Sequence, residues 1–176
     1  MVTATAASDH LDRLIVLTAA SKAFNIAGGE TAIAIIPDAA RRRAFDASFL
    51  DRESSPNRYG IAMLHAAFSE GDDWLDAVRA YIAGNFAILR DRLNALPGVS
   101  GMDMNSTYLS WVDFSGTGMT HEELMTRCLT DAKVAPSPGP QFGSGGNGWL
   151  RFNVALPRPT LDDALSRIEA AYSDLQ

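Results

Sequence analysis

The sequence is poor in cysteine, in basic residues and in long apolar runs, and each shortage excludes a class of protein. Cys128 is the single cysteine among 176 residues, so an internal disulfide is excluded and a reducing compartment is indicated. Lysine and arginine number 15 against 21 acidic residues, and the net charge of −6 disfavours a nucleic-acid or anionic-membrane partner. No apolar stretch approaches the roughly 20 residues of a membrane span, and residues 1–10 lack the features of a signal peptide. We therefore expect a cytoplasmic protein.

The apolar residues that are present alternate between the periodicities of strands and of helices. Their content of 47% is enough for one globular domain or slightly more. The pattern predicts strands at 14–17, 32–36, 108–114 and 149–155, and helices at 39–45, 61–68, 71–96 and 124–131, with a last helix capped by Thr160. This alternation is typical of the α/β class.

Lys22 is the first candidate functional residue. The continuous apolar run Leu14–Leu17 predicts a strand covered on both faces, and the small residues at 19–21 allow close approach to the backbone that follows. Lys22 has no carboxylate within several residues on either side. A lysine that is removed from solvent has a lowered pKa and becomes a nucleophile. The alternative is a lysine that extends from a strand end into solvent.

Arg151 is the second candidate. In the strand at 149–155, a period of two places Leu150, Phe152 and Val154 on one face, and Arg151 and Asn153 on the other. An arginine in this position suits bidentate binding of a carboxylate. The alternative is an exposed arginine on an edge strand.

Three other features are expected to be structural. The proline- and glycine-rich loop at 136–148 loosely resembles a dinucleotide-binding fingerprint, but it precedes a strand, so we expect it to line the mouth of a site. Cys128 and His65 have apolar neighbours, and we expect both to be packed side chains without a metal. The three arginines at 41–43 fan around a predicted helix and are expected to face solvent.

Two segments carry a resemblance to a known family. Ser21-Lys22-Ala23-Phe24-Asn25-Ile26-Ala27-Gly28 resembles the cofactor-lysine segment of pyridoxal-phosphate enzymes with the aspartate aminotransferase fold, most closely the branch of MalY- and PatB-type cystathionine β-lyases. Gly148-Trp149-Leu150-Arg151-Phe152-Asn153 resembles the Arg-x-Asn strand of the same family. The resemblance implies an α/β fold made of the end of the large domain at 1–65, a linking helix at 66–98 and the small C-terminal α/β domain at 99–176.

The resemblance also implies a function and roles for individual residues. Lys22 would carry pyridoxal 5′-phosphate covalently and act as the general base, with Ser21 and Asn25 beside the cofactor. Arg151 would bind the substrate α-carboxylate, together with Asn153. The activity implied is that of an aminotransferase or a carbon–sulfur β-lyase acting on an amino acid, in a cytoplasmic homodimer.

Departures from the family pattern leave three hypotheses open. Complete family members are more than twice as long as this chain. Ala19 stands where most members have serine or threonine, and Glu30 stands where many have a basic residue. The chain is therefore the C-terminal portion of such an enzyme or the partner of a separate N-terminal half, a catalytically inactive remnant, or an amino-acid- or carboxylate-binding module.

Overall fold

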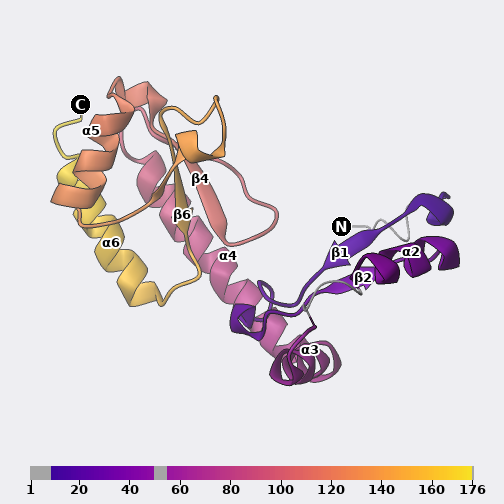
Figure 1. Ribbon diagram of the computed structural model, residues 1–176. Helices are drawn as coiled ribbons and strands as arrows, with labels where there is room; N and C mark the ends of the chain where they lie inside the picture. The colour runs from indigo at the N-terminus through magenta and orange to yellow at the C-terminus, as the bar shows by residue number, and fades with distance from the viewer. Residues whose placement is uncertain (1–8, 50–54, 176) are drawn as a thin grey trace. The chain divides into compact units, whose positions relative to one another are not determined.

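The computed structural model describes residues 9–49 and 55–175 and divides the chain into two compact units. The first unit comprises residues 1–77 and the second comprises residues 78–176. The boundary falls inside the longest helix, α4 (Asp72–Asn94), which is labelled in Figure 1. The expected division into the end of a large domain (1–65), a linking helix (66–98) and a small domain (99–176) stays a prediction.

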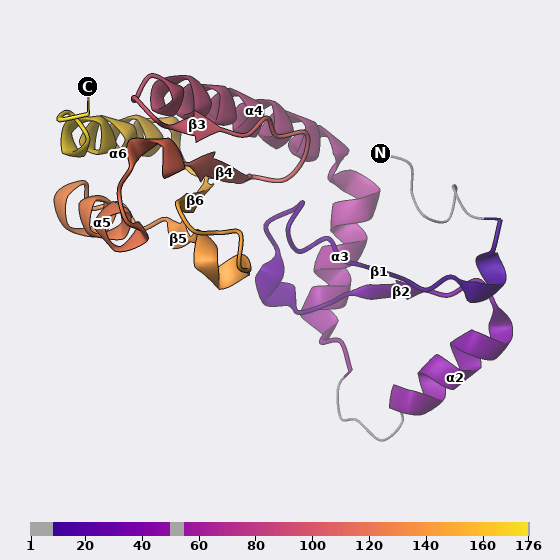
Figure 2. The same ribbon diagram turned by 90° about the horizontal axis from the view of Figure 1, so that it is seen from above.

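The described part of the first unit contains a small antiparallel ribbon, the helices α2 (Ala39–Phe49) and α3 (Arg58–Glu70), and the first residues of α4. Strands β1 (Val16–Thr18) and β2 (Ile33–Ile35) pair with Val16 opposite Ile35, and Figure 2 shows them side by side. Short 3-10 turns lie at Leu11–Arg13 and Ala27–Gly29.

The burial expected for the first strand is wrong. Ile15 is 47% exposed and Leu17 is 71% exposed. Among the described residues this unit has a sheet of just two strands, so no further layer covers these side chains. His65 is exposed as well, and not packed as expected, because it lies on an open side of α3.

Side-chain caps define the helix starts in this unit: α2 begins at the predicted residue 39, whereas α3 begins three residues before the predicted residue 61. The Asp38 carboxylate accepts a hydrogen bond from the backbone N–H of Arg41 at 2.8 Å and caps α2. The arginines at 41–43 are exposed, as expected. Asn57 caps α3, because its side-chain oxygen accepts from the N–H of Gly60 at 2.7 Å. The capped ends give both helices a defined first turn.

The second unit is an antiparallel sheet that packs against helices. Its strands are β3 (Ser100–Gly101), β4 (Leu109–Asp113), β5 (Ser137–Pro138) and β6 (Trp149–Asn153), in the spatial order β3-β4-β6-β5. The helical segments after α4 are a 3-10 turn at Ser115–Thr117, α5 (His121–Thr126) with a π-helical continuation (Arg127–Asp131), a 3-10 turn at Gly139–Phe142, and α6 (Arg158–Ala171). Figure 2 shows α4 and α6 side by side.

One continuous apolar core holds the second unit together. It combines the inward faces of β4 and β6 with the stripes of α4, α5 and α6; its members include Leu89, Leu93, Val112, Phe114, Leu124, Cys128, Leu150, Phe152, Val154, Leu161, Leu165, Ile168 and Tyr172. The predicted faces of the arginine strand are confirmed, and so is the packed Cys128. This core makes the sheet a rigid support for the side chains on its other face.

The last helix begins one turn before its predicted cap, whereas α5 begins directly after a capping threonine. Thr120 accepts a hydrogen bond from the N–H of Glu123 at 3.2 Å and caps α5. Thr160 lies inside α6, which begins at Arg158 after Pro157. Pro159 in the first turn has a dihedral angle already suited to a helix, so the helix starts without a side-chain cap. Within the described residues, no helix is both long and apolar enough to cross a membrane.

Candidate functional site

Lys22 lies in a tight turn immediately after β1. The N–H of Phe24 bonds to the carbonyl of Ala20 at 2.9 Å, and the N–H of Ile26 bonds to that of Ser21 at 3.0 Å. Asn25 closes the turn with a left-handed backbone (φ 55°), which asparagine adopts more readily than most residues. Ala20 is buried and Ser21 is half-buried, whereas the side chain of Lys22 is exposed. The turn therefore presents the lysine at its surface.

An aromatic cluster anchors this turn. The ring of Phe24 packs edge-on against Phe68, with 6.1 Å between centroids, and stacks on Trp74 at 6.0 Å. Gly71 makes this packing feasible, because a Cβ atom there would come within 2.4 Å of the Phe24 ring. Two residues after Lys22, the chain is thus fixed to α3 and to the start of α4.

A second anchor joins the end of the lysine segment to α3. The carbonyl oxygen of Gly29 accepts hydrogen bonds from Asn57 Nδ2 at 3.0 Å and from Thr31 Oγ1 at 2.8 Å. The backbones of Gly29 and Gly60 lie so close that a Cβ on Gly60 would approach the Gly29 oxygen to 2.0 Å. The backbone on both sides of Lys22 is therefore held, while its amine is left available.

The lysine amine has no ion pair and no hydrogen bond to the described residues. Of the two alternatives, the structure shows a lysine that extends into solvent. An accessible, unpaired amine can bond covalently to a carbonyl group. The hydroxyl of Ser21 and the side-chain amide of Asn25 lie in the same turn and can donate hydrogen bonds to an oxygen-rich ligand. Ala19 and Glu30 are exposed and add no cation to this segment. The residues of the turn thus fit a cofactor that attaches through a carbonyl and hydrogen-bonds through oxygen.

Arg151 lies at the centre of the sheet in the second unit. Strand β6 runs between β4 and β5, with Arg151 opposite Trp111 on one side and Ser137 on the other. The alternative of an edge strand is therefore wrong. The Arg151 Nη2 donates to Ser137 Oγ at 3.1 Å, and its Cζ lies 4.3 Å from the ring centroid of Phe142. The side chain is half-buried.

Arg151 differs from most half-buried arginines of its unit in having no acidic partner. No carboxylate of the described residues lies within ion-pair distance of it, whereas four neighbours have such pairs: Arg90 with Asp91, Arg92 with Glu169, Arg127 with Asp174, and Arg167 with Asp163. A half-buried guanidinium that keeps unused donors is suited to binding an external carboxylate.

Asn153 lies on the same face of β6 as Arg151, two residues further along. Its Oδ1 accepts from the N–H of Ala155 at 2.9 Å, and its amide nitrogen has no hydrogen bond to the described residues. The structure thus brings together Arg151 and Asn153 in the second unit, and Ser21, Lys22 and Asn25 in the first.

Sequence reasoning missed the residues that surround Arg151. Ser137 and Phe142 belong to the loop that was expected to line a site, and Trp111 comes from the neighbouring strand. The register of β4, β5 and β6 brings them together, and no local sequence motif predicts that register.

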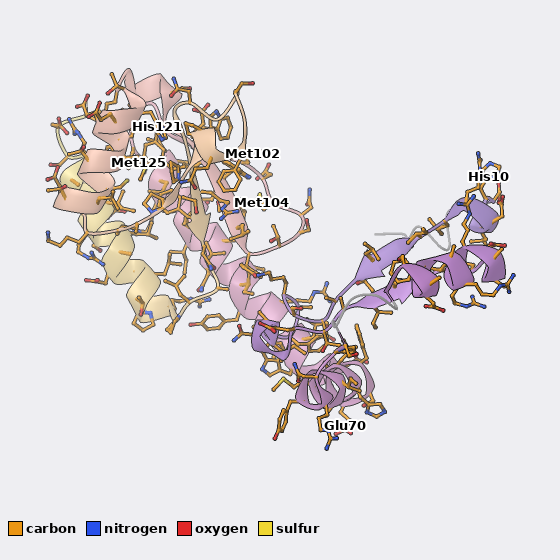
Figure 3. All side chains as sticks on the ribbon, in the orientation of Figure 1. His10, Glu70, Met102, Met104, His121 and Met125 are labelled. Carbon is orange, nitrogen blue, oxygen red and sulfur yellow. The ribbon has the colours of Figure 1, made fainter. Side chains whose placement is uncertain are left out.

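A metal centre is not supported by the described residues. His121 has both ring nitrogens buried without a hydrogen-bond partner there, and it lies beside Met125 on α5 in Figure 3. No group of three or more histidine, cysteine or acidic side chains in the described part of the chain converges on one point.

Comparison with known proteins gives consistent matches over nearly the whole chain. The family model for aminotransferase class I and II matches residues 2–168. Cystathionine beta-lyase PatB of Bacillus subtilis is 39% identical over 173 residues, which cover 97% of this chain and 44% of PatB. Protein MalY of Escherichia coli is 33% identical, with 85% and 39% covered.

A solved structure extends the match to three dimensions. Cystalysin from Treponema denticola, whose crystal structure contains pyridoxal 5′-phosphate, has a TM-score of 0.90 and 28% identity; the match covers 98% of this chain and 44% of cystalysin. The chain thus has part of the fold of these enzymes and spans less than half the length of the relatives it matches. The expected fold and resemblance are confirmed, and the chain belongs to the class I and II aminotransferase family.

Proposed function

We propose that this chain supplies the cofactor lysine and the carboxylate-binding arginine of a pyridoxal-phosphate-dependent enzyme that acts on an amino acid. The observation that carries this proposal is Lys22, an exposed and unpaired amine in the turn that follows β1, with the backbone anchored on both sides. Cystathionine β-elimination is the favoured reaction, because PatB is a cystathionine β-lyase. Transamination is the second candidate, since the family model is that of aminotransferases.

The chain's own residues take distinct roles in this proposal. Lys22 attaches the cofactor through its amine and later carries the proton removed from the substrate α-carbon. Ser21 and Asn25 hydrogen-bond to the cofactor. When bound, pyridoxal phosphate supplies the electron sink for carbanion chemistry. Arg151 binds the α-carboxylate through its unused donors, and Asn153 contributes its free amide.

A carboxylate-binding module is a further candidate that one observation favours. Arg151, Ser137 and Asn153 all belong to the second unit, which has a continuous core of its own. Binding of a carboxylate by this unit would then be independent of Lys22. The remaining hypothesis is an inactive remnant, in which neither Lys22 nor Arg151 binds a ligand.

The first unit exposes an apolar surface that is suited to binding a partner polypeptide. The buried apolar side chains described there are Ala20, Ile36 and Ala67. Its large exposed apolar side chains are Leu11, Ile15, Leu17, Ile35, Tyr59, Ile61, Met63, Phe68 and Trp74. An open groove of about 390 Å³ lies on this unit, lined by Ile33, Ile61, Leu64, His65, Phe68 and Ser69. Exposed apolar surface of this extent marks an interaction site.

We propose that this surface is covered by a polypeptide equivalent to the part of the relatives that this chain does not span. Two such assemblies, each of this chain with its covering polypeptide, would form a homodimer in the cytoplasm, where the free thiol of Cys128 stays reduced.

The expected observation is co-purification when the chain is co-expressed with the remaining portion of PatB. Leu17→Asp should weaken this association, and Leu129→Asp, in an exposed position of the second unit, should not. An equal effect of both substitutions would contradict the proposed surface.

The cofactor role can be tested on the chain itself. After incubation with pyridoxal phosphate and reduction with borohydride, peptide mapping should place the label on Lys22. The chain offers an internal control, because Lys133 is its other lysine and is also exposed. Preferential labelling of Lys22, lost in Lys22→Ala, supports the proposal. Equal labelling of both lysines at all concentrations would refute it.

A further inference from the structure

The guanidinium of Arg151 is contacted by two groups from the segment that precedes its strand. Ser137, on β5, accepts a hydrogen bond from Nη2 at 3.1 Å. Phe142, at the end of the 3-10 turn Gly139–Phe142, places its ring centroid 4.3 Å from Cζ. A cation at this distance from an aromatic face is attracted by the ring. One edge and one face of the guanidinium are thus held, and Nε and Nη1 have no hydrogen bond to the described residues.

The Phe142 ring is itself held by a tryptophan. Trp111 meets it edge to face, with 5.2 Å between centroids and 85° between planes. Trp149 packs against Trp111 at 6.4 Å in a similar arrangement. Phe142 is 49% exposed, so burial alone does not fix its position. The edge-to-face contact supplies a geometric constraint in addition to burial.

The loop that carries Phe142 has a defined backbone. Its ends meet at Gly139 and Gly146, where a Cβ on either residue would come within 2.1 Å of the other's carbonyl oxygen. The N–H of Gly146 bonds to Gly143, and the N–H of Trp149 bonds to Gly146. Gly143 has φ 136°, which a residue with a side chain rarely adopts. The glycines therefore close the loop so that Phe142 faces the arginine.

We propose that Phe142 and Ser137 are positioning residues that hold the Arg151 guanidinium ready for a carboxylate. They restrict the rotation of the side chain and leave the N–H groups of Nε and Nη1 and the second N–H of Nη2 for a carboxylate, which a guanidinium binds in parallel through Nη2 together with Nε or Nη1. A side chain that is ordered before binding loses less conformational entropy when the ligand arrives. The inference rests on the proposed role of Arg151 as the α-carboxylate ligand and adds the two groups that orient it.

The first test measures how ordered the Arg151 side chain is in the ligand-free chain. The ¹⁵N relaxation of the Arg151 Nε–H, assigned by its loss in Arg151→Lys, should give an order parameter near that of rigid backbone, about 0.85. In Phe142→Leu it should fall below about 0.6, and Phe142→Tyr should restore it. Ser137→Ala should lower it as well. Unchanged order in Phe142→Leu and Ser137→Ala would overturn the proposal.

Two matched variants control for general effects of substitution. Leu129→Ala removes an apolar side chain that is as exposed as Phe142, at 49%, elsewhere in the second unit. Ser166→Ala removes a hydroxyl that accepts from Arg92 Nη2 at 2.9 Å, which is the same type of contact as that of Ser137. Neither change should alter the order of the Arg151 Nε–H.

Binding separates this inference from the proposed function. Calorimetric titration of the full chain with L-cystathionine should show affinity lost in Arg151→Lys and weakened roughly fivefold in Phe142→Leu. Loss in Arg151→Lys with no change in Phe142→Leu would contradict positioning and leave the arginine's role intact. Unchanged binding in Arg151→Lys would instead refute the arginine's role in the proposed function.

Discussion

Asn85 donates a hydrogen bond from its side-chain amide to the carbonyl oxygen of Val154 at 2.9 Å. The same nitrogen donates to the carbonyl of Leu156 at 2.8 Å, and the side-chain oxygen accepts from Arg158 Nε at 3.1 Å. Asn85 is completely buried in α4. One side chain thus joins α4 to the segment between β6 and α6, directly after the strand that carries Arg151.

Replacement of Asn85 by leucine should therefore be costly. Two carbonyl groups and one guanidinium nitrogen would lose their partner in a buried place, and we expect the free energy of unfolding to fall by about 3 kcal/mol. Urea unfolding followed by circular dichroism measures this loss. Asn94→Ala is the matched control on the same helix, since Asn94 is exposed and accepts one bond from Gly101. A loss as large in the control would contradict the interpretation.

The ion pair between Arg92 and Glu169 predicts a specific dependence of stability on pH. Arg92 Nε and Nη2 each donate to a Glu169 carboxylate oxygen at 2.6 Å, and these bonds lower the pKa of Glu169. Because the folded pKa lies below the unfolded value of about 4.3, the contribution is complete above that value. It is lost as the pH falls through the folded pKa.

The size of this contribution is limited, because the Glu169 side chain is 37% exposed to solvent. We expect less than about 1 kcal/mol. Glu169→Gln should make the free energy of unfolding depend less steeply on pH as the pH falls below about 4.3, as measured by urea unfolding at each pH. Glu122→Gln, an exposed position on α5, should leave the slope unchanged. The pair is not the source of acid sensitivity if both variants keep the wild-type slope.

Cys128 should be chemically inert in the folded chain. Its thiol is buried, and burial raises its pKa, opposed in part by the contact of Sγ with the Tyr172 hydroxyl at 3.4 Å. A neutral, covered thiol is a poor nucleophile. Alkylation by iodoacetamide at pH 8 should be slower in buffer than in denaturant by a factor of about 100 or more. Similar rates in the two conditions would show that the second unit opens readily.

The raised pKa of the Cys128 thiol also predicts how the stability of the folded chain changes in alkaline solution. The folded state retains the thiol proton to a higher pH than the unfolded state, so this contribution to stability falls as the pH rises above about 8.5. Cys128→Ala should therefore reduce the loss of stability between about pH 8.5 and pH 10. The measurement is again urea unfolding, with wild type and variant compared at each pH.

Two leucines should respond in opposite ways to truncation. Leu165 is 1% exposed in the core of the second unit, and Leu165→Ala should cost about 2–5 kcal/mol. Leu17 is 71% exposed, and Leu17→Ala should change the stability of the isolated chain by less than about 0.5 kcal/mol. Urea unfolding of both variants tests this contrast. A large loss for Leu17→Ala would mean that its strand is covered in the chain by itself.

The turn that carries Lys22 and the strand that carries Arg151 could both be predicted from sequence, because each depends on local sequence features. The alternation at 149–155 sets the two faces of β6, and small residues mark the turn around Lys22. Burial of Leu17 could not be predicted, since it depends on whether another layer covers the strand. A continuous apolar run reflects burial of the strand in the complete fold of the family, and this chain spans a part of that fold.

The surroundings of Arg151 were beyond sequence reasoning for a different reason. Strand β5 is two residues long and ends at Pro138, so it has no alternating pattern to recognise. Ser137 reaches Arg151 through strand register alone. The π-helical turn after α5 and the early start of α6 at Arg158 likewise depend on packing and on proline geometry, which residue periodicity does not report.

The two sheets differ in how well their edges resist pairing with another molecule. In the second unit the outer strands β3 and β5 have two residues each, and Pro138 lacks the N–H that a new strand would need. In the first unit, β1 and β2 each have one neighbour among the described residues and display Leu17 and Ile35 to solvent. During expression without a partner, aggregation should therefore begin at the β1–β2 ribbon, where backbone groups and apolar side chains are unprotected together.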